Sequence, residues 1–190
     1  NAPTSDRQIR GVKYLSLDLT KFKAAQQLSS QDFDYVVHLG NYIEHTGFWA
    51  GGARVIEEHF GGLLNLLSII STKSLKRFIF VGSSDEFGTN HAPQHEDQRE
   101  APISPYAVSK VCSTALVQML HRTEGFPGVV LRLFLAYGPG QKTNRFLPSI
   151  ITSCLLGERF PVSEGDQLRD FCYVSDAVSA VFAAMIRPNV

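Results

Sequence analysis

The apolar residues of this chain gather in short compact runs and in longer stretches with helical spacing. Short runs bounded by glycine or polar residues are typical of buried strands, and longer periodic stretches are typical of helices. The predicted strands are residues 11–17, 35–39, 77–81 and 129–134. The predicted helices are residues 21–28, 56–72, 105–124, 145–156 and 174–186, with an extended stretch at 160–162. Strands that alternate with helices predict an α/β fold, in which helices cover both faces of a parallel sheet.

Local signals support two of these assignments and indicate where a site would lie. Ser104 can cap the helix 105–124, and Pro105 suits its first turn. The polar stretch 88–100 follows closely on the strand 77–81. Open parallel sheets bind their ligands at such strand ends, so we expect the functional site there.

Composition narrows the function classes. The 190 residues suit one sizeable core, and 18 basic residues balance 18 acidic ones, which does not favour nucleic acid or a membrane surface as a partner. The apolar run 129–137 is too short to span a bilayer. The cysteines, Cys112, Cys154 and Cys172, are odd in number and far apart, so they predict neither a disulfide framework nor a metal site. Free thiols predict a reducing compartment, and we expect a cytoplasmic protein.

Small and polar residues follow the strand 77–81 in the segment "FVGSSDEFG", residues 80–88. Small residues such as Gly82 let a ligand come close to the backbone, and hydroxyl and carboxylate groups offer hydrogen bonds. The polar members of this segment are Ser83, Ser84, Asp85 and Glu86. A polar turn at the end of a strand is the alternative interpretation.

Tyr106 and Lys110, in "PISPYAVSK", are four residues apart and share one helix face. A nearby ammonium favours the phenolate, so we expect Lys110 to lower the pKa of Tyr106. A phenol tuned in this way can exchange a proton with an alcohol, and a serine from the preceding strand could hold the same oxygen. The alternative is a solvated lysine beside a packed aromatic ring.

The order of several motifs resembles one family. The motifs "GSSDEFG", "PISPYAVSK", "LRLFLAYGPGQ" and "RDFCYVSDAV" follow one another as in the extended short-chain dehydrogenases/reductases. This family contains nucleotide-sugar epimerases, 4,6-dehydratases and 4-ketoreductases. The resemblance implies a Rossmann-like doubly wound parallel sheet and NAD or NADP as the cofactor. It also implies a nucleotide-diphosphate sugar as substrate and a homodimer formed through a helix bundle.

The resemblance assigns roles by matching motif positions. Ser83, Tyr106 and Lys110 match the family's catalytic group, with Lys110 also reaching the ribose of the cofactor. The remaining implied cofactor-binding residues are Asp18, Leu19, Leu39, Gly40 and Asn41. Ser84 and Arg169 are the implied substrate-binding residues, with Arg169 on the diphosphate; a surface ion pair between Arg169 and Asp170 is the alternative.

The chain also departs from the family pattern. His59 stands where an asparagine is usual, and Leu135 stands where an asparagine contacts the nucleotide-sugar. No Gly-rich phosphate turn occurs, so the sequence is expected to begin near the family's third strand. We therefore expect a fold that lacks the first strands and the end of the C-terminal substrate lobe. Residues 1–140 are the predicted cofactor-binding core, and residues 141–190 are the predicted start of the substrate lobe with a returning core helix.

The predicted reaction is hydride transfer at sugar C4, in an epimerase or a 4-ketoreductase. A 4,6-dehydratase is the alternative; it needs an added acid and base beside the catalytic serine, where Asp85 is the candidate. Two other classes are an inactive relative that binds a nucleotide or a partner, and an unrelated nucleotide-binding module. The unrelated module predicts an exposed Tyr106 far from Ser83.

Overall fold

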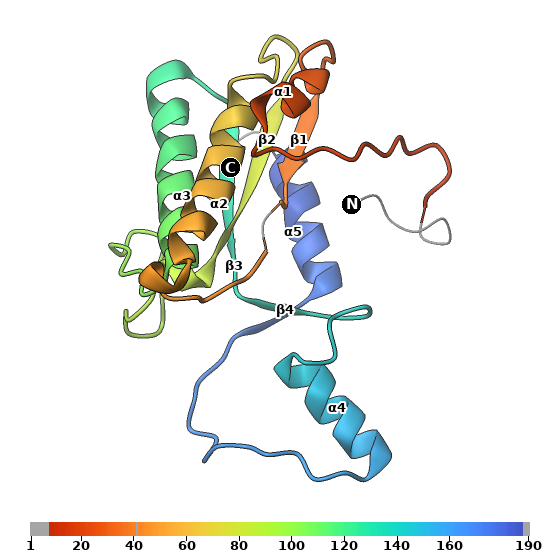
Figure 1. Ribbon diagram of the computed structural model, residues 1–190, viewed down its shortest axis with the longest axis vertical. Coiled ribbons are helices and arrows are strands. Elements are labelled where there is room, and N and C mark those ends of the chain that lie inside the picture. The colour runs from red at the N-terminus through yellow and green to blue at the C-terminus, as the bar shows by residue number, and fades with distance from the viewer. Residues whose placement is uncertain (1–7, 41, 188–190) are drawn as a thin grey trace.

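A computed structural model of the protein describes residues 8–40 and 42–187 (Figure 1). Its strands are β1 (Tyr35–His38), β2 (Arg77–Ser83), β3 (Gly128–Leu133), β4 (Leu135–Tyr137) and β5 (Phe171–Tyr173). Its α-helices are α1 (Phe22–Ala25), α2 (Gly52–Leu67), α3 (Pro105–Glu124), α4 (Phe146–Leu156) and α5 (Val174–Ile186). Its short 3₁₀ helices are η2 (Gln26–Leu28), η3 (Phe48–Ala50) and η4 (Ser84–Glu86).

The main sheet has the order β1-β2-β3, and all its strands are parallel. Helices α2 and α3 cover one face, and α5 lies against the other (Figure 1). Strands β4 and β5 form a separate parallel pair, with α4 beyond it (Figure 1). The predicted α/β class, with a parallel sheet covered on both faces, is therefore confirmed.

Strand β2 carries the core because its side chains alternate between two buried faces. Phe78 and Phe80 are fully buried against a cluster that α2 and α3 supply, including Leu63 and Val117. Ile79 points to the opposite face and joins a second cluster, whose other buried members are Val129 of β3 and Ala184 of α5. The sequence of β2 is therefore a continuous apolar run and does not alternate between apolar and polar residues.

The ends of α3 follow the local signals in the sequence. The Ser104 hydroxyl accepts a hydrogen bond from the backbone N–H of Ala107 at 3.1 Å, and Pro105 occupies the first turn. Gly125 ends the helix with φ 66°, a left-handed conformation that glycine adopts easily. Helix α2 begins at Gly52, before the predicted residue 56, and ends at residue 67 rather than 72.

The predicted strand 11–17 is wrong. Among the described residues this segment pairs with no strand, and Figure 1 shows it as an extended trace that leads into α1. Leu15 is 42% exposed, although its alternation with Leu17 suggested a buried face. A strand forms only where a neighbour satisfies its backbone groups, and alternation alone cannot supply that neighbour.

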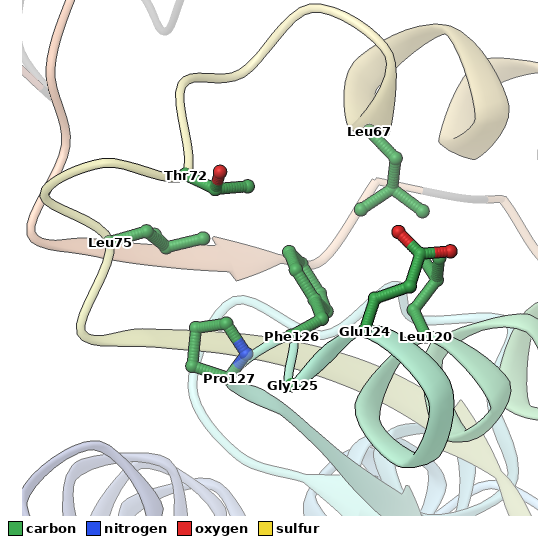
Figure 2. A pocket seen from close by; sticks show the side chains of 8 residues that line it. All are labelled: Leu67, Thr72, Leu75, Leu120, Glu124, Gly125, Phe126 and Pro127. Carbon is green, nitrogen blue, oxygen red and sulfur yellow. The ribbon is translucent and has the colours of Figure 1, made fainter.

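A hollow of about 410 Å³ lies away from the predicted site (Figure 2). It is lined by the C-terminal ends of α2 and α3 and by the turns that lead into β2 and β3. It therefore opens at the amino edge of the sheet, whereas ligands of parallel sheets bind at the carboxyl edge. Separately, no helix within residues 8–40 and 42–187 is long and apolar enough to cross a membrane.

Candidate active site at the carboxyl edge of the sheet

Ser83, the last residue of β2, is held by a capping box. Its hydroxyl accepts a hydrogen bond from the backbone N–H of Asp85 at 3.2 Å. In return, the Glu86 carboxylate accepts one from the Ser83 backbone N–H at 2.9 Å. This reciprocal pattern starts η4 and fixes the direction in which the chain leaves the sheet. The Ser83 side chain is thereby positioned at the carboxyl edge.

Glu86 has a structural role. It is 0% exposed, and its second oxygen accepts a hydrogen bond from Arg132 Nε at 2.9 Å. Arg132 also binds Glu100 at 2.6 Å, which ties the polar stretch 88–100 to β3. A carboxylate occupied in this way on both oxygens is not free to act on a substrate. Of the two acids that follow Ser83 and Ser84, only Asp85 remains available.

Tyr106 and Ser83 lie side by side although they belong to different elements. Tyr106 is only 5% exposed. Burial raises the pKa of Tyr106, and the charges of Asp85 and Glu86 add to that rise. A hydrogen bond with the Ser83 side chain and the charge of Arg145 oppose it. The unrelated nucleotide-binding module, which predicted an exposed Tyr106 far from Ser83, is contradicted.

Lys110 lies one turn after Tyr106 and is also 5% exposed. Its ammonium donates a hydrogen bond to the Val81 carbonyl at 2.7 Å and lies 5.8 Å from the centre of the Tyr106 ring. Burial lowers the pKa of Lys110 to about 8, against an opposing effect of Glu86. The expectation that Lys110 lowers the pKa of Tyr106 is wrong here, because the ammonium is directed at the Val81 carbonyl and burial dominates.

Two buried histidines, His38 and His59, lie on the interior side of the candidate site. His59 of α2 is 3% exposed, contacts the Tyr106 ring edge-on at 5.8 Å and lies within 3.2 Å of the Ser109 hydroxyl. His38 ends β1 and is 6% exposed. Burial, and after it the charge of Lys110, lowers the pKa of both histidines to about 4. One ring nitrogen of each, His38 Nδ1 and His59 Nε2, is buried without a hydrogen-bond partner.

A third histidine stands on the solvent side of Tyr106. The His45 ring lies 5.8 Å from the Tyr106 ring at an interplanar angle of 77°. Its Nε2 is 3.8 Å from Asp85 Oδ2, and the two side chains are 57% and 38% exposed. An imidazole and a carboxylate therefore form the rim of the site, next to Ser83 and Tyr106.

The implied cofactor-binding residues are distributed over two places. Leu39 and Gly40 are exposed directly after β1, at the carboxyl edge of the sheet. Asp18 is exposed and its carboxylate accepts two hydrogen bonds from Thr20, which lower the pKa of Asp18. Leu19 packs against the core below α2. Asn41 lies outside the described residues.

The implied substrate-binding residues are less closely grouped. Ser84 is half-buried in η4, next to Ser83. Arg169 is exposed just before β5, and its side chain donates to the Leu168 carbonyl at 2.9 Å. Within the described part of the chain, no ion pair joins Arg169 to Asp170 or to the acids beside Ser83.

Sequence reasoning missed His45 and the role of Glu86. His45 lies in the loop 39–47, which has no hydrophobic period, and its only signal is that this loop follows the carboxyl end of a buried strand. The signal for Glu86 was stronger. A serine followed three residues later by glutamate is the pattern of a capping box.

Comparison with known proteins places this arrangement in context. The model of the NAD dependent epimerase/dehydratase family matches residues 1–190. A dTDP-glucose 4,6-dehydratase of Haemophilus influenzae is 27% identical over 83% of this chain and 50% of its own length. A GDP-6-deoxy-D-mannose reductase of Pseudomonas aeruginosa is 31% identical over 77% of this chain and 52% of its own length.

Solved structures agree with the fold. The structure of UDP-glucose 4-epimerase with UDP-glucose from Thermotoga maritima superposes with a TM-score of 0.81 and 27% identity. The superposition covers 96% of this chain and 62% of that one. The chain spans about half the length of the curated relatives it matches.

Proposed function

The chain belongs to the NAD dependent epimerase/dehydratase family, and we propose that it modifies a nucleotide-diphosphate sugar by NAD(P)-dependent hydride transfer at sugar C4. The proposed activity is that of an epimerase or a 4-ketoreductase. The observation that carries this proposal is the buried contact between Tyr106 and Ser83, with Lys110 one turn away, at the carboxyl edge of a parallel sheet. This edge is where open α/β sheets bind their ligands.

Each member of this group has a distinct proposed role. Tyr106 exchanges a proton with the sugar hydroxyl or ketone oxygen, and Ser83 holds that oxygen by a hydrogen bond. Since Tyr106 keeps its proton at neutral pH, it is ready to donate one to a ketone oxygen. Lys110 uses one of its three N–H donors on Val81, which leaves donors for the ribose hydroxyls of a cofactor. The nicotinamide, when bound, supplies or accepts the hydride.

The residues present suit the nicotinamide ribose end of such a cofactor. The buried ring nitrogens of His38 and His59 lack partners, and they lie near the Lys110 charge. Leu39 and Gly40, exposed at the same sheet edge, let a ligand approach the backbone. We propose that these residues hold the cofactor together with Asp18, Leu19 and Asn41.

We propose that the substrate lobe begins after residue 140 and that residues before it form the cofactor-binding core. Helix α4 lies beyond the β4-β5 pair and apart from the three-stranded sheet (Figure 1), which supports this division. A hollow of about 350 Å³ lies between α4 and this pair, lined by Tyr137 and Tyr173 on one side and Leu147 and Ile151 on the other. Its aromatic lining suits a sugar or a base. Arg169 precedes β5 and is the proposed partner of the diphosphate.

A 4,6-dehydratase is the second candidate function, and one observation favours it. Asp85 is beside Tyr106, is partly exposed and is not held in the Glu86 network. It could therefore act as an added acid or base during loss of water. Detection of a 4-keto-6-deoxy product from a nucleotide-hexose would select this candidate over the first.

The test is turnover of a panel of nucleotide-sugars, followed at the nicotinamide absorbance and by product analysis. The panel contains UDP-glucose, UDP-glucuronic acid and a nucleotide-4-ketosugar with NADPH. Tyr106→Phe is expected to lower kcat roughly 100-fold or more. Tyr35→Phe is the matched control, because Tyr35 is an exposed tyrosine on β1. Equal turnover by Tyr106→Phe and the wild type would contradict the proposed role of Tyr106, and no turnover by the wild type would favour an inactive, binding relative.

Two further parts of the proposal concern the assembly and the compartment. We propose a homodimer formed through α2 and α3, whose Leu64 and Met119 are 42% and 38% exposed. We also propose a cytoplasmic location, which the free Cys112, Cys154 and Cys172 support. Sedimentation of the purified protein tests the first, and localisation of a tagged copy tests the second.

A further inference from the structure

His45 occupies a place that the proposed chemistry has not used. It touches the solvent side of Tyr106, with ring centroids 5.8 Å apart, while His59 touches the buried side at the same separation. His59 has a buried ring and a pKa lowered to about 4 by burial, so it stays neutral near pH 7. Of these two imidazoles that flank Tyr106, only His45 is open to solvent.

Asp85 is placed to orient His45. Its carboxylate lies 3.8 Å from His45 Nε2, and its charge acts on Tyr106. Its backbone N–H donates to the Ser83 hydroxyl, which ties the pair to the inner site. A carboxylate beside an imidazole fixes the orientation of the ring.

The proposed reduction needs a proton from solvent in every turnover. When a ketone becomes an alcohol, its carbon gains a hydride and its oxygen gains the proton of the Tyr106 hydroxyl. Tyr106 is then a phenolate with only 5% exposure, so bulk water has little access to it. Imidazole is the usual proton carrier near neutral pH. An epimerase has no such need, because the proton taken from the hydroxyl is returned to the same oxygen.

We propose that His45, oriented by Asp85, carries protons between solvent and Tyr106. The His45 imidazolium gives its proton to the Tyr106 phenolate, and the neutral imidazole then takes a proton from water. The direction reverses when an alcohol is oxidised. His45 acts through Tyr106 and is therefore a positioning residue of the proton path. The inference rests on the proposed function, since it assigns the proton supply of that same site.

Few charged groups surround His45. Asp85 faces it from η4, and Tyr106 faces it from α3. Glu44 precedes it in the same loop, where its carboxylate accepts a hydrogen bond from the Thr46 hydroxyl. These neighbours are acids, and the positive charge of Arg145 also acts on Tyr106.

Chemical rescue tests the proton role in the full chain. His45→Ala is expected to lower kcat for reduction of a nucleotide-4-ketosugar by NADPH about 100-fold, with little change in KM. Added imidazole should restore the rate in proportion to its concentration, and methylimidazoles should do so according to their acid strength. Epimerisation of UDP-glucose should be nearly unchanged. His91→Gln, on the exposed stretch 88–100, is the matched control and should behave as wild type.

A variant of similar shape separates a proton role from a structural one. His45→Gln keeps a hydrogen-bonding side chain beside Asp85 but cannot carry a proton near neutral pH. It should be as slow in reduction as His45→Ala. A wild-type rate of ketosugar reduction by His45→Gln would overturn the proposal. So would a failure of added imidazole to raise the reduction rate of His45→Ala.

A second measurement does not depend on turnover. In protein labelled at tyrosine Cζ, the NMR signal of Tyr106 should shift as His45 titrates, and this step should vanish in His45→Gln but persist in His91→Gln. A Tyr106 signal that ignores His45 overturns the proton path whatever the panel shows. A panel without turnover, together with a Tyr106 signal that follows His45, counts against the proposed function and supports the coupled pair.

Discussion

Two buried histidines make the fold sensitive to acid, and their replacement tests this reasoning. His38 stacks against Phe78 and Phe80, with ring centroids 6.5 and 5.6 Å away, and His59 is 3% exposed. Burial is the main cause, and the charge of Lys110 the second, that lower the pKa of each from 6.5 to about 4. Both side chains therefore stay neutral in the folded protein at pH values where a solvated histidine has already bound a proton.

The unfolded chain binds protons at these two positions as the pH falls from 6.5 toward 4, and the folded chain does not. The free energy of unfolding is therefore complete above pH 6.5 and is lost progressively as the pH falls to 4. At about 1.4 kcal/mol for each pKa unit, one histidine removes about 2 kcal/mol between roughly pH 7.5 and pH 5. Both together remove about 4 kcal/mol, a large part of a typical domain stability of about 5–15 kcal/mol.

Urea unfolding at these two pH values measures the effect. Far-UV circular dichroism is the suitable probe, because Trp49, the one tryptophan, is 95% exposed and reports little of the core. The double variant His38→Phe/His59→Gln should lose about 4 kcal/mol less than wild type on acidification. His95→Gln, which changes an exposed loop histidine, should keep the wild-type loss. The same loss in the double variant and in wild type would refute the reasoning.

Three other substitutions test the packing of the site, each by urea unfolding. Gly82→Ala should cost about 1–3 kcal/mol because its methyl would collide with the Glu86 carboxylate, whereas Gly61→Ala, with free space around it, should stabilise by up to about 1 kcal/mol. Ser104→Ala should cost about 1 kcal/mol through loss of the α3 cap, and Ser104→Thr should retain most of it. Glu86→Gln should cost about 3–5 kcal/mol by breaking a buried ion pair, while Lys76→Gln, in an exposed pair, should cost less than about 1 kcal/mol.

The sequence predicted best those elements whose signals are local. Helix α3 has its cap, its first-turn proline and its C-terminal glycine within the element, and both of its predicted ends are confirmed. The segment 11–17 carried only an alternating pattern, and the pairing partner that a strand needs is not a local property. Strands β4 and β5 were missed for a related reason, because each is three residues long and they pair across a long stretch of sequence.

The candidate site also has features that local sequence predicts and features that depend on tertiary packing. The helical spacing of Tyr106 and Lys110 predicted that they share a face, and the strand end at Ser83 predicted the sheet edge. What the sequence could not supply was the direction of electrostatic effects. The pKa of Tyr106 depends on how deeply the ring is buried and on where the Lys110 ammonium is directed, and both are set by tertiary packing.

Burial shifts the pKa values of Tyr106 and Lys110 in opposite directions, and this affects which direction of proton transfer the site favours. It raises the pKa of Tyr106 and lowers the pKa of Lys110 to about 8, so each group is driven toward its uncharged form. Near neutral pH the pair holds a phenol beside an ammonium, which is the state that donates a proton. Removal of a proton from an alcohol needs the phenolate instead, and the charges of Asp85 and Glu86 work against it. The charge of Arg145 opposes both effects, and an oxidised nicotinamide ring, which carries a positive charge that the reduced ring lacks, would add to that opposition. With its phenol protonated, the site suits proton donation to a ketone, and a cation bound beside Tyr106 would favour proton removal.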